Sequence, residues 1–165
     1  MATMIALVAT LCATSVAIVL VVSRSELTAR ETAAFLLLFS VLFILRVAGQ
    51  FLVVLRAPAW LPPMHQWHLM PYRILLPTQI GFLALMVFIE MSLIRGWAPI
   101  GGREHAFGRI LIGFSCVYAG VMAVRYAVRM YRRPGERWFG GAIPIVFHFV
   151  LAAFLFTWGR YNVSG

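Results

Sequence analysis

Long apolar runs dominate the chain and alternate with short segments that hold most of the charged residues. Runs of about 20 residues match a hydrocarbon core of about 30 Å, because an α-helix rises about 1.5 Å per residue. Five such spans are expected, at about 4–22, 33–55, 74–94, 110–131 and 140–158. The pattern predicts an all-α integral membrane protein, a five-transmembrane-helix bundle. With no separate polar region visible, residues 1–165 are expected to form a single polytopic membrane domain.

The connection between the second and third spans differs from the other connections. It carries prolines at positions 58, 62, 63 and 71, which are incompatible with a regular helix through much of this segment. Its tryptophans and Tyr72 suit the level of the lipid headgroups. A Pro/Trp-rich loop that lies on the membrane surface or re-enters the bilayer is therefore expected here.

Composition supports the membrane assignment and limits the partners. Hydrophobic residues make up 62% of the chain and charged residues 12%, whereas soluble domains hold about 25% charged residues. The net charge of +9 comes from arginines that mostly flank the apolar runs, as in proteins that contact anionic lipid headgroups. Membrane lipids and other membrane subunits or a second copy are thus the expected partners, and nucleic acid is not. A bacterial plasma (inner) membrane is the expected location, but the arginines do not indicate an orientation.

Missing residue types exclude several chemistries. All basic residues are arginine and all acidic residues are glutamate. Without lysine there is no retinal or pyridoxal Schiff base and no phosphate-binding P-loop lysine. Cys12 and Cys116 stand far apart, and no Cys-x-x-Cys pair occurs. Thiol-redox chemistry and cysteine-ligated clusters are therefore not expected.

Small residues recur every four positions in two spans. These residues are Ala9, Ala13 and Ala17 in the first span, and Ser115, Ala119, Ala123 and Ala127 in the fourth. Small side chains at this spacing let helices approach closely in lipid. Each stripe is expected to form a helix–helix contact, either within the chain or between subunits.

Polar side chains inside four spans form the candidate ligand-binding set: Arg46, Gln50, Gln79, Arg125 and His148. Counted along the helices, four of them lie about 8–13 Å below the side that holds the Pro/Trp loop, and Gln50 follows Arg46 by one turn. Ionisable groups in a span are costly and usually face the bundle interior. These residues are therefore expected to share one layer.

Three interpretations of this layer remain open. The arginines could reach the membrane surface or bond backbone carbonyls and Gln50. They could bind an anionic or carbonyl-bearing ligand, such as a lipid or a quinone, because guanidinium pairs with phosphate and carboxylate. They could also pair with an acidic group of a partner subunit. Glu90 is expected outside the layer, since it lies about 6 Å from the opposite side.

A second candidate site lies in the Pro/Trp-rich loop, where His65 and His68 stand three residues apart beside methionines. Such a pair could ligate copper, or one of the two could join His148 around a b-type haem. The alternative is that both histidines simply lie at the level of the lipid headgroups.

The sequence contains no complete catalytic set. The leading hypothesis is therefore a small subunit or accessory protein of a larger membrane complex, without catalytic activity of its own. Its Arg/Gln/His layer would bind a lipid, a quinone-like ligand or a partner's acidic group. The first alternative is a small oligomeric anion transporter or channel. The second is a membrane enzyme that uses the histidines with a metal or haem.

Overall fold

The computed structural model describes residues 2–56, 72–97, 104–132 and 142–164. These residues form five helices, and they contain no β-strand. The helices are α1 (Ala2–Arg24), α2 (Ala29–Arg56), α3 (Tyr72–Arg95), α5 (His105–Arg132) and α6 (Ala142–Val163). The predicted all-helical architecture is confirmed for this part of the chain, with one helix over each predicted span. The Pro/Trp-rich loop, with His65 and His68, lies outside the described residues.

Local signals explain where helices begin and end. Before α2, the backbone N–H of Thr28 donates to the Glu31 carboxylate at 2.9 Å, and the Glu31 N–H donates to the Thr28 hydroxyl at 3.3 Å. This reciprocal capping box satisfies donors that the first helical turn leaves without partners. After α3, Gly96 adopts a φ of 65°, a left-handed conformation that glycine accepts easily at a helix C-terminus.

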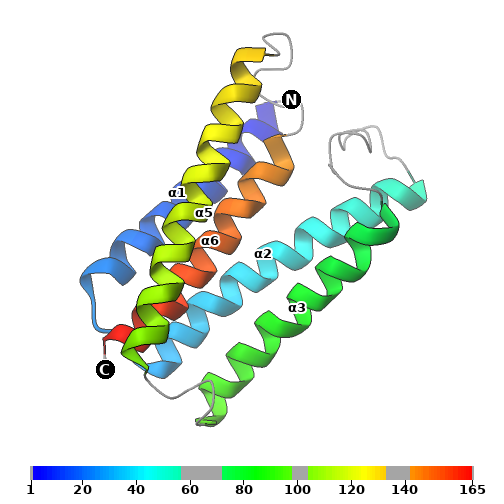
Figure 1. Ribbon diagram of the computed structural model, residues 1–165. Helices are drawn as coiled ribbons and strands as arrows, with labels where there is room; N and C mark the ends of the chain where they lie inside the picture. Colours follow the sequence, from blue (N-terminus) through cyan, green and yellow to red (C-terminus); the bar gives the residue numbers. More distant parts are fainter. Residues whose placement is uncertain (1, 57–71, 98–103, 133–141, 165) are drawn as a thin grey trace.

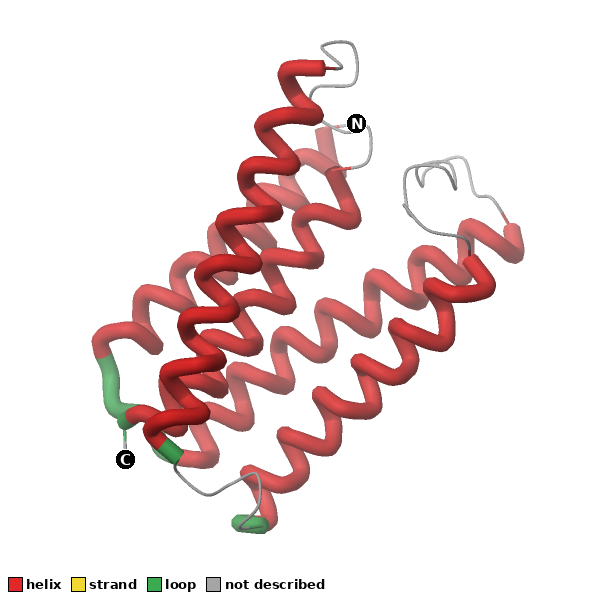
Figure 2. The backbone as a smooth tube through the Cα atoms, viewed as in Figure 1, coloured by secondary structure: helices red, strands yellow, loops and turns green. Residues whose placement is uncertain are grey.

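Helix α6 is the centre of the bundle. It packs against α5, α2 and α1, whereas the main packing partner of α3 is α2. The buried core accordingly joins α2, α3 and α6 through large side chains such as Phe39, Ile89 and Phe154. Figures 1 and 2 show the α2–α3 pair diverging from α5 and α6 toward one end of the molecule. We call this the wide end; there α2 and α5 end, and α3 and α6 begin.

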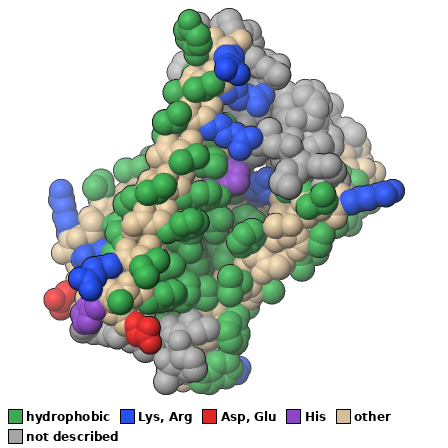
Figure 3. All heavy atoms as spheres, viewed as in Figure 1, with side chains coloured by type: hydrophobic (Ala, Val, Ile, Leu, Met, Phe, Trp, Pro, Cys, Tyr) green, Lys and Arg blue, Asp and Glu red, His purple; other side chains and the backbone are tan. Residues whose placement is uncertain are grey.

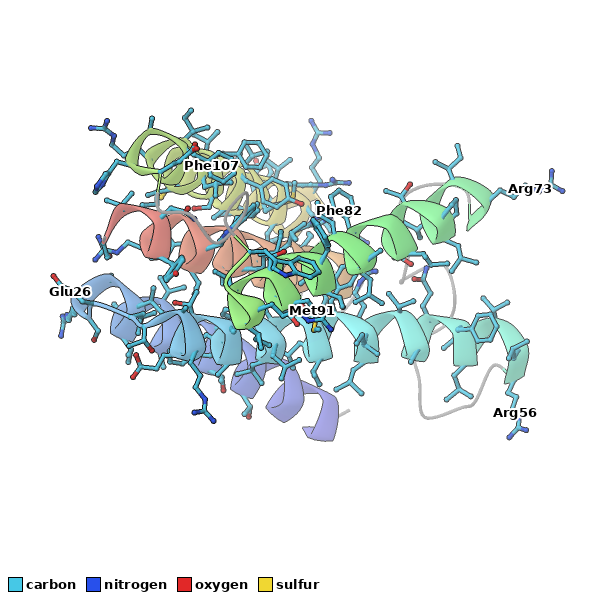
Figure 4. The ribbon with its side chains drawn as sticks, turned by 90° about the horizontal axis from the view of Figure 1, so that it is seen from below. Glu26, Arg56, Arg73, Phe82, Met91 and Phe107 are labelled. Atoms are coloured by element: carbon cyan, nitrogen blue, oxygen red, sulfur yellow. The ribbon has the colours of Figure 1, made fainter. Side chains whose placement is uncertain are left out.

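Within the described ranges, three helical segments are long and apolar enough to cross a membrane: Ala29–Arg56, Arg73–Arg95 and His105–Arg132. Their outer faces expose large apolar side chains, including Ile110 and Val117, each 67% exposed. Exposed apolar surfaces on this scale mark membrane or protein contact. At the two ends of the bundle, charged side chains such as Glu26, Arg56 and Arg73 extend outward (Figure 4).

Two glycines bring α5 and α6 close together. A Cβ placed on Gly108 of α5 would lie 2.7 Å from the Gly159 carbonyl oxygen of α6, and one on Gly159 would lie 2.9 Å from the Gly108 carbonyl oxygen. No side chain fits at either position unless the helices separate. Gly108 and Gly159 therefore set the spacing of α5 and α6 at this crossing.

The predicted stripes of small residues do not form this crossing. Ala13, Ala17, Ala123 and Ala127 are exposed, and Ser115 is the buried member of the α5 stripe. The expectation that the stripes pack within the chain is wrong for these alanines. Contact between subunits through them stays a prediction.

Candidate functional site

A buried pair of amides links α2 to α3 near the wide end. The Gln79 side-chain N–H donates to the Gln50 amide oxygen at 3.1 Å, and these residues are only 4% and 1% exposed. Two of the four polar side-chain atoms of this pair take part in the bond. The other two, the Gln50 nitrogen and the Gln79 oxygen, are buried without a hydrogen-bond partner among the described residues. Buried polar atoms normally have partners. The Gln50 nitrogen can therefore donate to a further acceptor, and the Gln79 oxygen can accept from a further donor.

Arg46 lies one turn before Gln50 on α2 and is 7% exposed. Its guanidinium stands over the Phe147 ring of α6, with Cζ 5.5 Å from the ring centroid. Such a cation–π contact stabilises a cation away from water by about 0.5–2 kcal/mol. Phe147 thus holds the Arg46 head between α2 and α6.

His148, the next residue on α6, faces α5. Its Nδ1 lies 2.5 Å from the Tyr118 hydroxyl, and the two rings meet edge to face. Arg46 reaches this part of α6 through Phe147, the residue before His148. Arg125 lies two turns after Tyr118 on α5 and is exposed.

Glutamates are absent from this region in the described part of the chain. Glu26, Glu31 and Glu104 lie at the opposite end, in or next to the first turns of α2 and α5. Glu90 is buried and accepts a hydrogen bond from the Ser40 hydroxyl. Figure 3 shows basic side chains gathered over α5 toward the wide end, beside a recess in this face. The electrostatic character of the site is therefore positive.

The Ser40–Glu90 bond is the second polar link between α2 and α3. Relative to Gln50–Gln79 it lies ten residues earlier on α2 and eleven later on α3, as the antiparallel arrangement requires. We expect Ser40→Ala to lower the free energy of unfolding by about 1 kcal/mol, the usual scale for helix-to-helix hydrogen bonds in membranes. Titration with denaturing detergent, followed by circular dichroism, measures it. The control is Ser92→Ala, because the buried Ser92 hydroxyl bonds the Phe88 carbonyl of its own helix; equal losses in the two variants would contradict the interhelical role.

An apolar cavity of about 240 Å³ adjoins the polar residues. It is lined by α3, α5 and α6 and includes Phe82, Phe114, Tyr118, Leu151 and Leu155. Tyr118 belongs to both regions: its hydroxyl bonds His148 and its ring lines the cavity. Tyr118 thus joins the lining of the cavity to His148.

The structure brings most of the predicted set together in pairs. Gln50 bonds Gln79, and Arg46 stands over Phe147 beside His148, whereas Arg125 is exposed. Sequence reasoning missed Phe147 as the partner of Arg46 and Tyr118 as the partner of His148. The signal available in the sequence was the adjacent pair Phe147 and His148 in the fifth predicted span, with Tyr118 in the fourth. Among the described residues no group of three His, Cys, Asp or Glu side chains could hold a metal ion.

No protein-family model, curated protein or solved structure matches this chain. The geometry of the site and the chemistry of its residues are therefore the basis for a functional assignment.

Proposed function

We propose that this protein is a small five-span membrane subunit or accessory protein that binds a ligand at the wide end of its helix bundle. The site consists of Arg46, Gln50, Gln79, Arg125 and His148, and its ligand is a membrane molecule or an acidic group of a partner subunit. The chain would act by holding this ligand rather than by catalysing a reaction. A bacterial plasma membrane is the proposed location.

The observation that carries the proposal is the half-used amide pair. A buried donor or acceptor left without a partner costs about 1–3 kcal/mol. The Gln50 nitrogen and the Gln79 oxygen are both in this state among the described residues. A ligand with a carbonyl, carboxylate or phosphate oxygen would accept from Gln50. The nearby positive charges of Arg46 and Arg125 favour the same kind of oxygen-rich group.

Native mass spectrometry of protein extracted gently from its own membrane tests the proposal. We expect the wild type to carry a mass increment from a small molecule or a second chain. Gln50→Leu should lose most of that increment, because leucine offers no hydrogen bond and fills a similar volume. Thr78→Val is the matched control, since Thr78 is exposed and bonds the Ile74 carbonyl of its own helix.

Two results would overturn the proposal. One is a bare wild-type monomer under conditions in which a known lipid-binding membrane protein retains its lipid. The other is an increment that Gln50→Leu and Thr78→Val retain equally, since the bound species would then lie elsewhere on the surface.

A further inference from the structure

We infer that the ligand is an anionic amphiphile, whose phosphate or carboxylate head lies among Arg46, Gln50 and His148 and whose apolar tail enters the cavity between α3, α5 and α6. This inference rests on the proposed function, because it names the ligand class of the same site. It adds a second binding region, lined by Phe82, Leu151 and Leu155. Both the head and the tail of the ligand are then necessary for tight binding.

Charge determines the choice of head. The Arg46 guanidinium stands over Phe147, the residue before His148, whereas the glutamates in the described ranges lie at the far end of the bundle or are bonded to Ser40. A guanidinium binds phosphate or carboxylate with charge-assisted hydrogen bonds, which are about twice as strong as neutral ones. An anionic head therefore gains more here than the neutral carbonyl of a quinone does.

The position of the cavity determines the tail. Phe82 lies one turn beyond Gln79 on α3, and Leu151 one turn beyond His148 on α6, so the lining continues from the polar residues along the same helix faces. The volume of about 240 Å³ is below the range of about 300–1,000 Å³ that encloses a whole drug-sized ligand. The cavity is thus suited to part of a tail, with the remainder in the bilayer.

The packing of α3 gives the tail a route of entry. Helix α3 has α2 as its main packing partner, so its other side borders the cavity without close support from α5. Figure 4 shows Phe82 on the side of α3 that faces α5. Phe82 and Phe114, on the two walls, are 44% and 56% exposed. An amphiphile could therefore enter sideways from the hydrocarbon region, with its head kept at the depth of the arginines.

Binding of defined probes to delipidated protein tests the inference. The probes are a single-chain lysophosphatidylglycerol, inorganic phosphate as the head alone, and decylubiquinone as a neutral amphiphile. We expect the lysolipid to bind most tightly. Leu155→Trp, which fills the cavity, should weaken its binding roughly tenfold, the effect of withdrawing about two methylenes from an apolar site. Phe82→Trp narrows the cavity from the half-exposed α3 wall and should act in the same direction if Leu155→Trp folds poorly.

The matched control fills a different cavity. A larger apolar cavity of about 500 Å³ lies between α1, α5 and α6, with Val19 in its lining. Val19→Phe should leave lysolipid binding unchanged. Phosphate binding as tight as that of the lysolipid would overturn the role of the tail. Preferred, Gln50-dependent binding of decylubiquinone would overturn the anionic head while leaving the proposed function intact. If no probe binds and the native protein also carries no mass increment that depends on Gln50, the proposed function and the inferred ligand class are both wrong.

Discussion

Gly108→Ala is expected to destabilise the protein by about 1–3 kcal/mol, the usual penalty for overpacking a closely packed contact. The new methyl group would stand 2.7 Å from the Gly159 carbonyl oxygen and 2.9 Å from the Asn162 Cβ. Neither neighbour is the flexible end of a side chain, so relief requires α5 and α6 to separate. Because α6 also packs on α2 and α1, that separation would disturb the centre of the bundle. Unfolding in denaturing detergent measures the loss.

Gly120→Ala is the matched control for this prediction. It makes the same change on the same helix, where a new Cβ meets nothing within 4 Å. Alanine has a higher helix propensity than glycine by about 1 kcal/mol, so this variant should be as stable as the wild type or more stable. If both glycine variants are destabilised to the same extent, the loss comes from the helix itself and not from the α5–α6 contact.

The helices were predictable because their signal is local. A run such as 33–55 is apolar almost throughout, and an α-helix satisfies the backbone hydrogen bonds of such a run within the segment itself, as lipid requires. Helix α2 extends past both ends of this run. At its start, the Thr28–Glu31 capping box begins the helix before the apolar residues do. Charged residues at the ends of a helix lower the mean hydropathy of its terminal turns without breaking the helix, so an apolar run is shorter than the helix that contains it.

Helix contacts were less predictable because they depend on which faces meet. A four-residue repeat of alanines indicates a surface that can pack closely, but it names no partner. Ala13 and Ala17 are exposed, while single glycines at 108 and 159, which form no repeat together in the sequence, let α5 and α6 approach closely. Two glycines 51 positions apart become a pair only once the antiparallel crossing of α5 and α6 is known.

The candidate site shows the same division. Depth along the span nominated Gln79 for the layer, and its spacing of one turn from Arg46 nominated Gln50, because the rise and the period of a helix are fixed. Their hydrogen bond depends on the relative rotation of α2 and α3, which the sequence does not report. The Tyr118–His148 contact likewise depends on how α5 faces α6. The rotation and register of neighbouring helices are set by how their side chains pack. In lipid both the packed and the lipid-facing sides of a helix are apolar, so the sequence pattern does not distinguish them.

Arg46→Leu is expected to reduce ligand binding roughly 10- to 100-fold, since a hydrogen bond to a charged group contributes about 1.5–3 kcal/mol. The same substitution should not lower the free energy of unfolding of the ligand-free protein. Arg46 is 7% exposed, so leucine removes the cost of keeping a charge away from water, and this gain offsets the loss of the cation–π contact with Phe147. Binding and stability are therefore expected to change independently, which a merely structural arginine would not produce.

Two further variants define what the Arg46 head contributes. Arg46→Lys keeps the positive charge but loses the planar fork that binds two oxygens and stacks on Phe147, so its binding should fall between those of the wild type and Arg46→Leu. Arg109→Leu removes an exposed charge near the start of α5, at the opposite end from the site, and should leave binding unchanged. Titration of one anionic amphiphile against all four proteins measures the series. Equal binding by Arg46→Leu and Arg109→Leu would show that the ligand responds to net charge alone. A graded loss from wild type through lysine to leucine requires a cation with the shape of guanidinium at this depth, in contact with the head of the ligand.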